Sequence, residues 1–393
     1  MSAVLQGRGR EHIILERRRI GERWRSERWD SLRFQFPSWS LRLPGYRYAG
    51  DDPDGFAHRT QIVRVVEEYA TRVGAPVREG VNVVGLEAAD GGGYRLATTA
   101  GRMTARRVVV ASGPFQRPMT PELARGLPPS LHQLDPTTYR GPDALPPGGV
   151  LVVGSGASGC QIGHELLRAG RRVILAVSRH RRVPRRFRGR DLYWWLERLG
   201  RFEQSIDSFP DRRSPPSVVV TGVDGGYDVD VRRFAAEGMT IAGRLMGAKD
   251  GIVAFDRNAD HVLAEADLAY EDFLSKVRGA VTPELHAELA DEEVDDQPSG
   301  PVSVGALESV DLARERIATV IWATGYEYAY DWLRVGVLDH RGAPVQRRGV
   351  TAQPGLYFLG LHWMHTFRSG LLSGVGDDAE FIADHMDAAS PAC

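Results

Sequence analysis

The 393-residue sequence predicts an α/β fold built on parallel strands, and two observations lead to this prediction. The stretch VLVVGSGASG, residues 150–159, runs from four apolar residues into three glycines, and the helical pattern CQIGHELLRAG follows it. The stretch EHIILE, residues 11–16, is a second buried-strand pattern that ends in an acid. A strand, a glycine turn and a helix N-terminus in this order are typical of a Rossmann-like domain, in which a dinucleotide pyrophosphate meets the helix amides.

The composition predicts a soluble globular protein that is long enough for two domains. Hydrophobic residues make up 42% of the chain, and 50 Lys and Arg against 51 Asp and Glu give a formal net charge of -1. We therefore expect no nucleic-acid partner and no membrane partner selected by charge. The two cysteines, Cys160 and Cys393, exclude a disulfide framework and a cysteine metal site, and they favour the cytoplasm. We find no stretch that is apolar enough to span a bilayer and no signal-peptide pattern.

We assign residues 1–145 to the first part of one nucleotide-binding domain. SAVLQGRG, residues 2–9, has the pattern of the last turns of a helix, and EHIILE that of the second strand of a βαβ unit. A glycine fingerprint is expected about 20 residues before such an acid, so the first strand and its glycine turn would lie before Met1. A start assigned at an internal methionine or a truncated chain would account for this, and a lost nucleotide site is the alternative.

The rest of this first part contains an irregular segment followed by a regular one. Residues 22–48 are rich in Trp, Arg and Pro without a clean period, which predicts an ordered loop rather than a regular element. Residues 58–74 then predict an amphipathic helix, and residues 77–113 predict a series of strands separated by glycine turns.

A proline- and glycine-rich linker at residues 140–149 leads into a second, inserted domain, which we place at residues 146–312. Its segment 184–300 shows little pattern, and the acidic tract at 288–300 predicts a solvated surface loop. Residues 313–393 would complete the first domain. They contain two strand patterns, ATVIWATGY and GLYFLGL, and a final helix that begins with acids.

The glycine turn in the second domain is the most specific motif in the chain. It follows a strand, opens a helix and precedes a further strand, RRVILAV, at residues 171–177. The glycines let the backbone approach a pyrophosphate, and amides at the helix N-terminus bind it. The candidate binding residues are Gly154, Ser155, Gly156, Ala157, Ser158 and Gly159.

The residues after RRVILAV predict NADPH rather than NADH. An NAD-specific unit carries an acid there for the ribose 2′-hydroxyl, whereas this chain carries Ser178, Arg179 and, further on, Arg182. A hydroxyl and guanidinium groups suit a 2′-phosphate, since arginine can donate two hydrogen bonds to a phosphate. A solvated basic loop or a nucleic-acid patch is the alternative, and it is favoured for the arginines beyond Arg182.

The order of these motifs resembles the flavin-containing monooxygenases and their bacterial relatives. The resemblance covers nearly the whole chain, most weakly over residues 200–300. It implies two dinucleotide-binding domains, the NADPH domain inserted in the FAD domain, and a monooxygenase in which hydride passes from NADPH to FAD and oxygen is transferred to a small substrate. An NADPH-dependent flavin oxidase or reductase, and a degenerate non-catalytic protein, are the alternatives. The substrate and the oligomeric state stay unknown.

The resemblance also implies residues of an FAD site. Glu16, with Arg17 beside it, would hold the adenosine ribose, and Val83 would meet adenine through its backbone. The loop residues Trp24, Arg25 and Trp29 would cover the pyrophosphate and the isoalloxazine, or would form an aromatic cluster packed on its own loop.

Four further residues are implied at strand and helix ends. Gly113 and Gly325 would end strands that pass between the domains, or would be ordinary turn glycines. Gly376 and Asp377 would begin a helix whose positive end faces the flavin pyrimidine, or would form a plain acidic N-cap.

Two departures from the family pattern concern oxygen transfer. Aligned on Tyr139, the chain has Pro129, Leu131 and Asp135 where the monooxygenase signature has phenylalanine, glycine and histidine. Ser38 stands where many relatives place an asparagine near the flavin. We expect these changes to weaken oxygenation but not the binding of FAD and NADPH, and we assign no catalytic residue.

Overall fold

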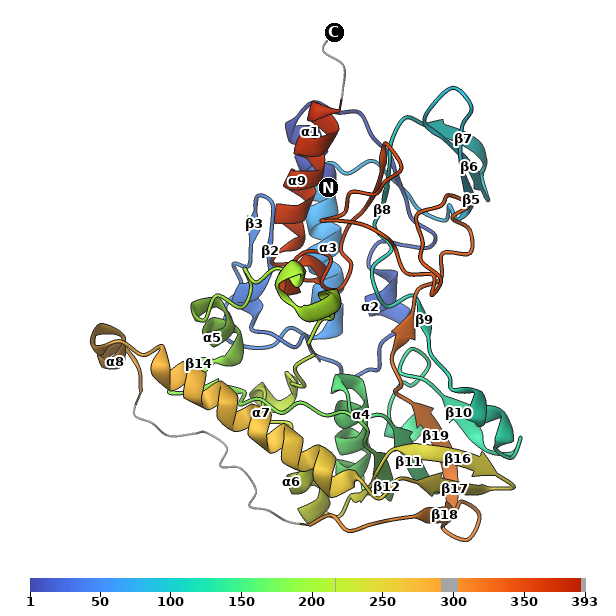
Figure 1. The fold of residues 1–393 in the computed structure, drawn as a ribbon, viewed down its shortest axis with the longest axis vertical. Coiled ribbons are helices and arrows are strands. Elements are labelled where there is room, and N and C mark those ends of the chain that lie inside the picture. The colour runs from blue at the N-terminus through green and yellow to red at the C-terminus, as the bar shows by residue number, and fades with distance from the viewer. Residues whose placement is uncertain (216, 291–302, 390–393) are drawn as a thin grey trace.

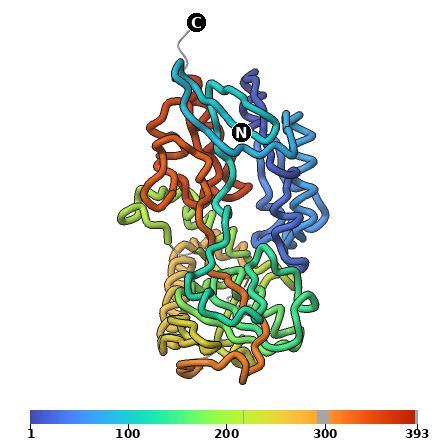
Figure 2. Tube along the Cα trace, turned by 90° about the vertical axis from the view of Figure 1, so that its right-hand side faces the viewer, coloured from blue at the N-terminus to red at the C-terminus, as the bar shows by residue number. Residues whose placement is uncertain are grey.

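The computed structural model describes residues 1–215, 217–290 and 303–389, and these form two halves stacked along the long axis (Figure 1). In Figure 2 the first and last parts of the chain, blue and red, lie in one half, while most of the green and yellow middle lies in the other. A yellow-green part of the middle lies against the red part, where the amide of Ile206 donates to the carbonyl oxygen of His365 at 2.7 Å. The middle of the chain therefore forms most of one half, and the segments that come before and after it in the sequence form most of the other.

The half built from the middle of the chain is organised around a five-stranded parallel sheet. In spatial order its strands are β10 (His132–Leu134), β19 (Ile317–Trp322), β11 (Gly149–Val153), β12 (Val173–Ala176) and β15 (Thr240–Ala242). The helix α4 (Ala157–Arg168) connects β11 to the neighbouring β12. The strand, glycine turn, helix and strand predicted for residues 150–177 are confirmed.

Two layers cover this sheet. One face packs against an antiparallel sheet of β16 (Leu245–Lys249), β17 (Ile252–Phe255) and β18 (Ser309–Asp311). The other face packs against α4, α6 (Val231–Ala236) and the start of α7 (Ala259–Gly279). Since both faces are covered, the central strands β11 and β12 are apolar along their whole length.

The domain boundaries placed at 145 and 312 do not coincide with this sheet. The strand β10 lies before the first boundary and β19 lies after the second, yet both pair within the sheet. A fully apolar strand carries no sign of which parallel sheet it joins, so sequence pattern alone could not place β19.

The other half contains both ends of the described chain. It holds α1 (Ser2–Gly7), the parallel pair β1 (Ile14–Leu15) and β4 (Val77–Arg78), and the parallel pair β8 (Val108–Val110) and β21 (Leu356–Phe358). An antiparallel sheet of β5 (Val83–Ala88), β6 (Tyr94–Thr98) and β7 (Gly101–Ala105) lies beside them. The helices α3 (Arg59–Arg72) and α9 (Val375–Ala388) confirm the helices predicted at 58–74 and near the C-terminus.

Residues 22–48 contain short elements where we predicted an irregular loop. They include α2 (Glu22–Ser26) and the hairpin of β2 (Arg42–Leu43) and β3 (Tyr46–Arg47). The prediction of no regular element was wrong for these, because a five-residue helix is too short to show a helical period.

The remaining elements are short. They are β9 (Arg117–Pro118), β13 (Arg186–Phe187), β14 (Arg190–Asp191), α5 (Leu192–Arg198), α8 (Pro283–Glu288) and β20 (Tyr326–Glu327). Most of the acidic tract predicted as a surface loop, residues 291–300, lies outside the described residues, as does Cys393. Across the ranges that the structure describes, no helix combines the length and the apolar character needed to cross a membrane.

Candidate functional site

The glycine turn between β11 and α4 is shaped by close backbone contacts. Gly154 has φ +108°, and a Cβ there would lie 2.4 Å from the carbonyl oxygen of Ala323. A Cβ on Gly159 would lie 1.8 Å from the carbonyl oxygen of Gly154. These two positions therefore need glycine for the fold itself, because the strand turns sharply and the helix packs against that turn.

Gly156 differs from the other two glycines, because its side faces open space. It is the N-cap residue of α4, is exposed, and a Cβ there would meet no atom within 4 Å. No side chain caps this helix, so the first amides of Ala157 and Ser158 have no side-chain partner. A phosphate group can take that position.

The loop after β12 lies against the glycine turn. The Ser155 hydroxyl donates to the carbonyl oxygen of Arg179 over 3.2 Å, and the His180 Nδ1 lies 3.0 Å from the carbonyl oxygen of Ser155. Ser155 itself is buried, whereas Ser178 and Arg179 are exposed. The structure thus brings Ser178 and Arg179 beside the helix N-terminus.

Arg182 does not share this exposed surface. Its side chain is 3% exposed and forms ion pairs with Asp230 at 3.1 Å and Asp267 at 3.4 Å. Its guanidinium also lies 4.4 Å from the centre of the Tyr270 ring. These contacts hold Arg182 inside the domain, so the exposed guanidinium beside the glycine turn is that of Arg179.

In the first domain, two of the predicted FAD residues line one open pocket. Arg17 and Val83 meet at a cavity of about 370 Å³, together with Asn82, Val84, Ala329, Asp331 and Trp332. Glu16 directly follows β1 and precedes Arg17, and its Oε1 accepts a hydrogen bond from the Arg18 amide at 2.9 Å.

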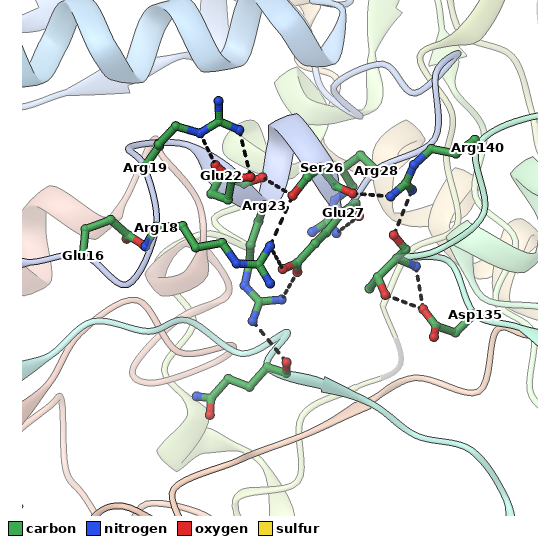
Figure 3. A network of polar contacts seen from close by, with 12 residues as sticks. Glu16, Arg18, Arg19, Glu22, Arg23, Ser26, Glu27, Arg28, Asp135 and Arg140 are labelled. Atoms are coloured by element: carbon green, nitrogen blue, oxygen red, sulfur yellow. Dashed lines mark hydrogen bonds and ion pairs between the residues drawn. The ribbon is translucent and has the colours of Figure 1, made fainter. Parts of the chain in front are cut away.

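An arginine-rich network surrounds α2 (Figure 3). Arg23 pairs with Glu27 at 2.8 Å and also donates to the carbonyl oxygen of Gln116 at 3.1 Å. Arg19 pairs with Glu22 at 2.7 Å and lowers the pKa of that carboxyl. Burial lowers the pKa of Arg23. The sequence reasoning missed this network, although the density of arginines in residues 17–28 was a visible signal.

The predicted loop residues Trp24, Arg25 and Trp29 are engaged in packing. Trp24 contacts Phe34, with ring centroids 6.3 Å apart, and Arg25 pairs with Glu67. Trp29 is 4% exposed, and its ring lies 6.5 Å from that of Tyr139. Trp29 therefore packs on the core of the five-stranded sheet and not only on its own loop, and the role of these three residues at FAD stays a prediction.

Gly113 and Gly325 flank the connection between the two halves. Both have positive φ, +72° and +97°, and between them β9 pairs with β20 in antiparallel fashion (Figure 1). At the other predicted site, Gly376 and Asp377 lie in the first turn of α9, with Asp377 exposed.

Residues 1–199 match the sequence model of a family described as pyridine nucleotide-disulphide oxidoreductase. The chain belongs to this family. It is 31% identical over 380 residues to an uncharacterized oxidoreductase CzcO-like of Geobacillus kaustophilus (strain HTA426), with 95% of this chain and 90% of that protein covered. The predictions of an oxidoreductase and of a pyridine nucleotide cofactor are confirmed.

Solved structures of several oxidoreductases have the same fold as this pyridine nucleotide-disulphide oxidoreductase. A flavin-containing monooxygenase from Stenotrophomonas maltophilia matches with TM-score 0.66 and 18% identity over 98% of this chain and 94% of that one. A bacillithiol disulfide reductase from Bacillus cereus matches with TM-score 0.61 and 14% identity over 99% and 95%. OTEMO in complex with FAD and NADP matches with TM-score 0.54 and 13% identity over 98% and 83%. The resemblance to flavin-containing monooxygenases is confirmed for the fold.

The departures from the monooxygenase pattern have structural roles in this family member. The Asp135 carboxylate accepts from the amide of Thr137 at 2.7 Å, and the Ser38 hydroxyl donates to the carbonyl oxygen of Gly55 at 2.8 Å. Tyr139, the aromatic residue that is kept, is buried and donates to Glu165 at 2.9 Å. Each of these side chains is therefore held by a neighbour within the protein.

The described residues contain no pair of cysteines that could form the disulphide to which the family description refers. Cys160 lies in α4 and is completely buried, and burial raises the pKa of its thiol to about 12. A thiol in this state is a poor nucleophile, because the thiolate is the reactive form.

Proposed function

We propose that the chain is an NADPH-dependent flavoprotein monooxygenase that acts on a small organic substrate with molecular oxygen. The observation that carries the proposal is the second nucleotide-binding unit, in which Arg179 stands beside the glycine turn where an NAD-specific unit has an acid. FAD and NADPH are the cofactors of this proposal. OTEMO, which has the same fold and binds FAD and NADP, supports it.

The residues of the second domain fit NADPH. The uncapped N-terminus of α4 offers amides to the pyrophosphate, and the open face of Gly156 leaves room for its oxygens. Arg179 offers two parallel N–H donors to a 2′-phosphate, and the exposed hydroxyl of Ser178 offers a third.

The residues of the first domain fit the adenosine end of FAD. Arg17, Asn82 and Trp332 line an open cavity together with one acid, Asp331. Glu16, next to Arg17, would accept hydrogen bonds from the ribose, as an acid at the end of a second strand does. The first turn of α9 would direct its positive end at the flavin ring. FAD, when bound, supplies hydride acceptance and the reaction with oxygen.

The role of the chain itself is orientation and exclusion of water. The antiparallel pair of β9 and β20 connects the two domains, and it would hold them at a fixed separation when the nicotinamide and the flavin are bound. Contacts such as the hydrogen bond from Arg185 to the carbonyl oxygen of Gln35, at 2.7 Å, fix the second domain on the loop of the first.

A flavin oxidase or reductase that does not oxygenate a substrate is the second candidate. The hydrogen bonds of Ser38 and Asp135 favour it, since these side chains stand at two of the four altered monooxygenase positions and are hydrogen-bonded to the protein backbone.

The two candidate functions differ in the product that receives the oxygen atoms, and this can be measured. Protein supplied with FAD is mixed with NADPH, ¹⁸O₂ and a panel of thioethers, amines and ketones, and both labelled product and hydrogen peroxide are measured against NADPH consumed. We expect labelled product together with a large share of peroxide. Peroxide alone with every compound would contradict oxygenation and support the oxidase.

A further inference from the structure

We propose that His180 is a positioning residue that fixes the backbone of Arg179 for recognition of the 2′-phosphate of NADPH. The proposal rests on the proposed use of NADPH. In this proposal His180 does not contact the cofactor. It contacts Ser155, the residue of the glycine turn whose hydroxyl is also bonded to the backbone of Arg179.

The geometry links two neighbouring residues of the loop to one residue of the turn. Ser155 is 2% exposed, its hydroxyl donates to the carbonyl oxygen of Arg179 at 3.2 Å, and its own carbonyl oxygen lies 3.0 Å from Nδ1 of His180. A carbonyl oxygen can only accept, so Nδ1 of His180 carries the proton. Two hydrogen bonds therefore join the glycine turn to the loop. One ends at the carbonyl oxygen of Arg179, and the other starts from the side chain of His180.

The surroundings of His180 keep its ring neutral. Its Nε2 is shut off from solvent, and burial lowers the pKa of the imidazole against the opposing effects of the Ser155 backbone and Asp230. The ring is thus neutral near pH 7. A neutral ring with its proton on Nδ1 donates one hydrogen bond in a fixed direction.

The loop is also anchored on both sides of Arg179. Val177 is fully buried and its amide donates to the carbonyl oxygen of Ala242 at 2.8 Å, while Arg182 pairs with Asp230 at 3.1 Å. Between these anchors the exposed guanidinium of Arg179 extends from a backbone that does not have to be ordered when the ligand binds. Such preorganisation increases affinity, because less conformational entropy is lost on binding.

The test compares two fragments that differ by one phosphate, adenosine 2′,5′-bisphosphate and 5′-AMP, titrated calorimetrically into the purified chain. The wild-type protein is expected to bind the bisphosphate more tightly. His180→Phe keeps a ring but loses the donor, and it should reduce this preference by roughly 5- to 10-fold. His180→Asn places an amide N–H near the position of Nδ1 and should restore most of it.

The control and a second variant guard against effects on folding. His261→Phe changes an exposed histidine of the same domain and should leave the preference unchanged. If His180→Phe does not fold, His180→Gln, whose longer side chain moves the amide N–H away from the Ser155 carbonyl oxygen, should lower the preference in the same way.

Two results would overturn the inference alone: equal weakening of both fragments in His180→Phe, which is the effect of a merely structural role, or an unchanged preference in that variant while Arg179→Ala loses it. A wild-type protein that binds both fragments equally would overturn the use of NADPH and this inference with it.

Discussion

Two glycines of the same turn should respond differently to replacement by alanine. Gly159→Ala should lower stability, whereas Gly156→Ala should lower the affinity for NADPH. Gly159→Ala would place a methyl group 1.8 Å from the carbonyl oxygen of Gly154 and 3.2 Å from the Cβ of Ala323. Gly156→Ala would place it where no protein atom lies within 4 Å, on a backbone with φ -71° and ψ 179° that any residue adopts. The first substitution would overlap the backbone of the protein, whereas the second would occupy space that we assign to the pyrophosphate of NADPH.

The expected magnitudes follow from these contacts. In a helix interior, Gly→Ala would by itself gain roughly 1 kcal/mol. At Gly159 the overlap is with backbone, which has to move, so we expect a net loss of about 1–3 kcal/mol in the free energy of unfolding. At Gly156 the poorer N-cap and the lower entropy of the unfolded chain oppose each other, each by less than about 1 kcal/mol. The methyl group there should nevertheless lower the affinity for NADPH by at least about tenfold, or ~1.4 kcal/mol.

Thermal unfolding and a fluorescence titration with NADPH, both on the same preparations, measure the two effects. Gly159→Ala should lower Tm by several degrees, while Gly156→Ala should keep the wild-type Tm and lose affinity. If Gly156→Ala binds NADPH like the wild-type protein, the pyrophosphate does not lie over that face of the turn. If it lowers Tm as much as Gly159→Ala does, the assignment of the two glycines to different roles is wrong.

Three further predictions concern buried groups. Burial raises the pKa of Cys160 to about 12, so its thiol should not react with a disulfide reagent near pH 8 until the protein is unfolded, and rapid reaction of the folded protein would contradict this. Burial lowers the pKa of His164 from 6.5 despite its hydrogen bond to Glu237, so the folded state binds fewer protons than the unfolded one. The stability that this group contributes should be complete above pH 6.5 and should be lost as the pH falls below it. Denaturant unfolding at several pH values should show a smaller pH dependence in His164→Gln, and an identical slope would argue against burial as the cause. Arg182→Met should cost about 3–5 kcal/mol because it removes a buried guanidinium that pairs with the buried Asp230 carboxylate, whereas Arg179→Ala should change stability by less than about 0.5 kcal/mol. Similar unfolding curves for these two arginine variants would refute the contrast.

The second nucleotide-binding unit could be predicted from the sequence because its signals are local. The glycines, the apolar strands on either side and the helix between them lie within residues 149–177, and each has a recognisable pattern. The roles of the individual glycines could not be separated in this way. The difference between Gly156 and Gly159 depends on atoms of Gly154 and Ala323 that the fold brings close.

Arg182 shows where the sequence reasoning reached its limit. Ser178, Arg179 and Arg182 look alike as polar residues after a strand, yet Arg182 is paired with Asp230 and Asp267, which are 48 and 85 residues further along the chain. Ion pairs over such separations leave no local pattern. The same holds for Trp29, whose contact with Tyr139 joins the aromatic loop to the other half.

The measurement that tests the account most directly is the anaerobic reduction of FAD in the FAD-supplied protein, followed by the loss of flavin absorbance with NADPH or NADH at equal, subsaturating concentrations. Because Arg179 stands where an acid would select NAD, NADPH should reduce the flavin faster, and Arg179→Ala should remove most of a difference of about 10- to 100-fold. Equal rates with both nicotinamides in the wild-type protein would contradict the assignment of this site to NADPH.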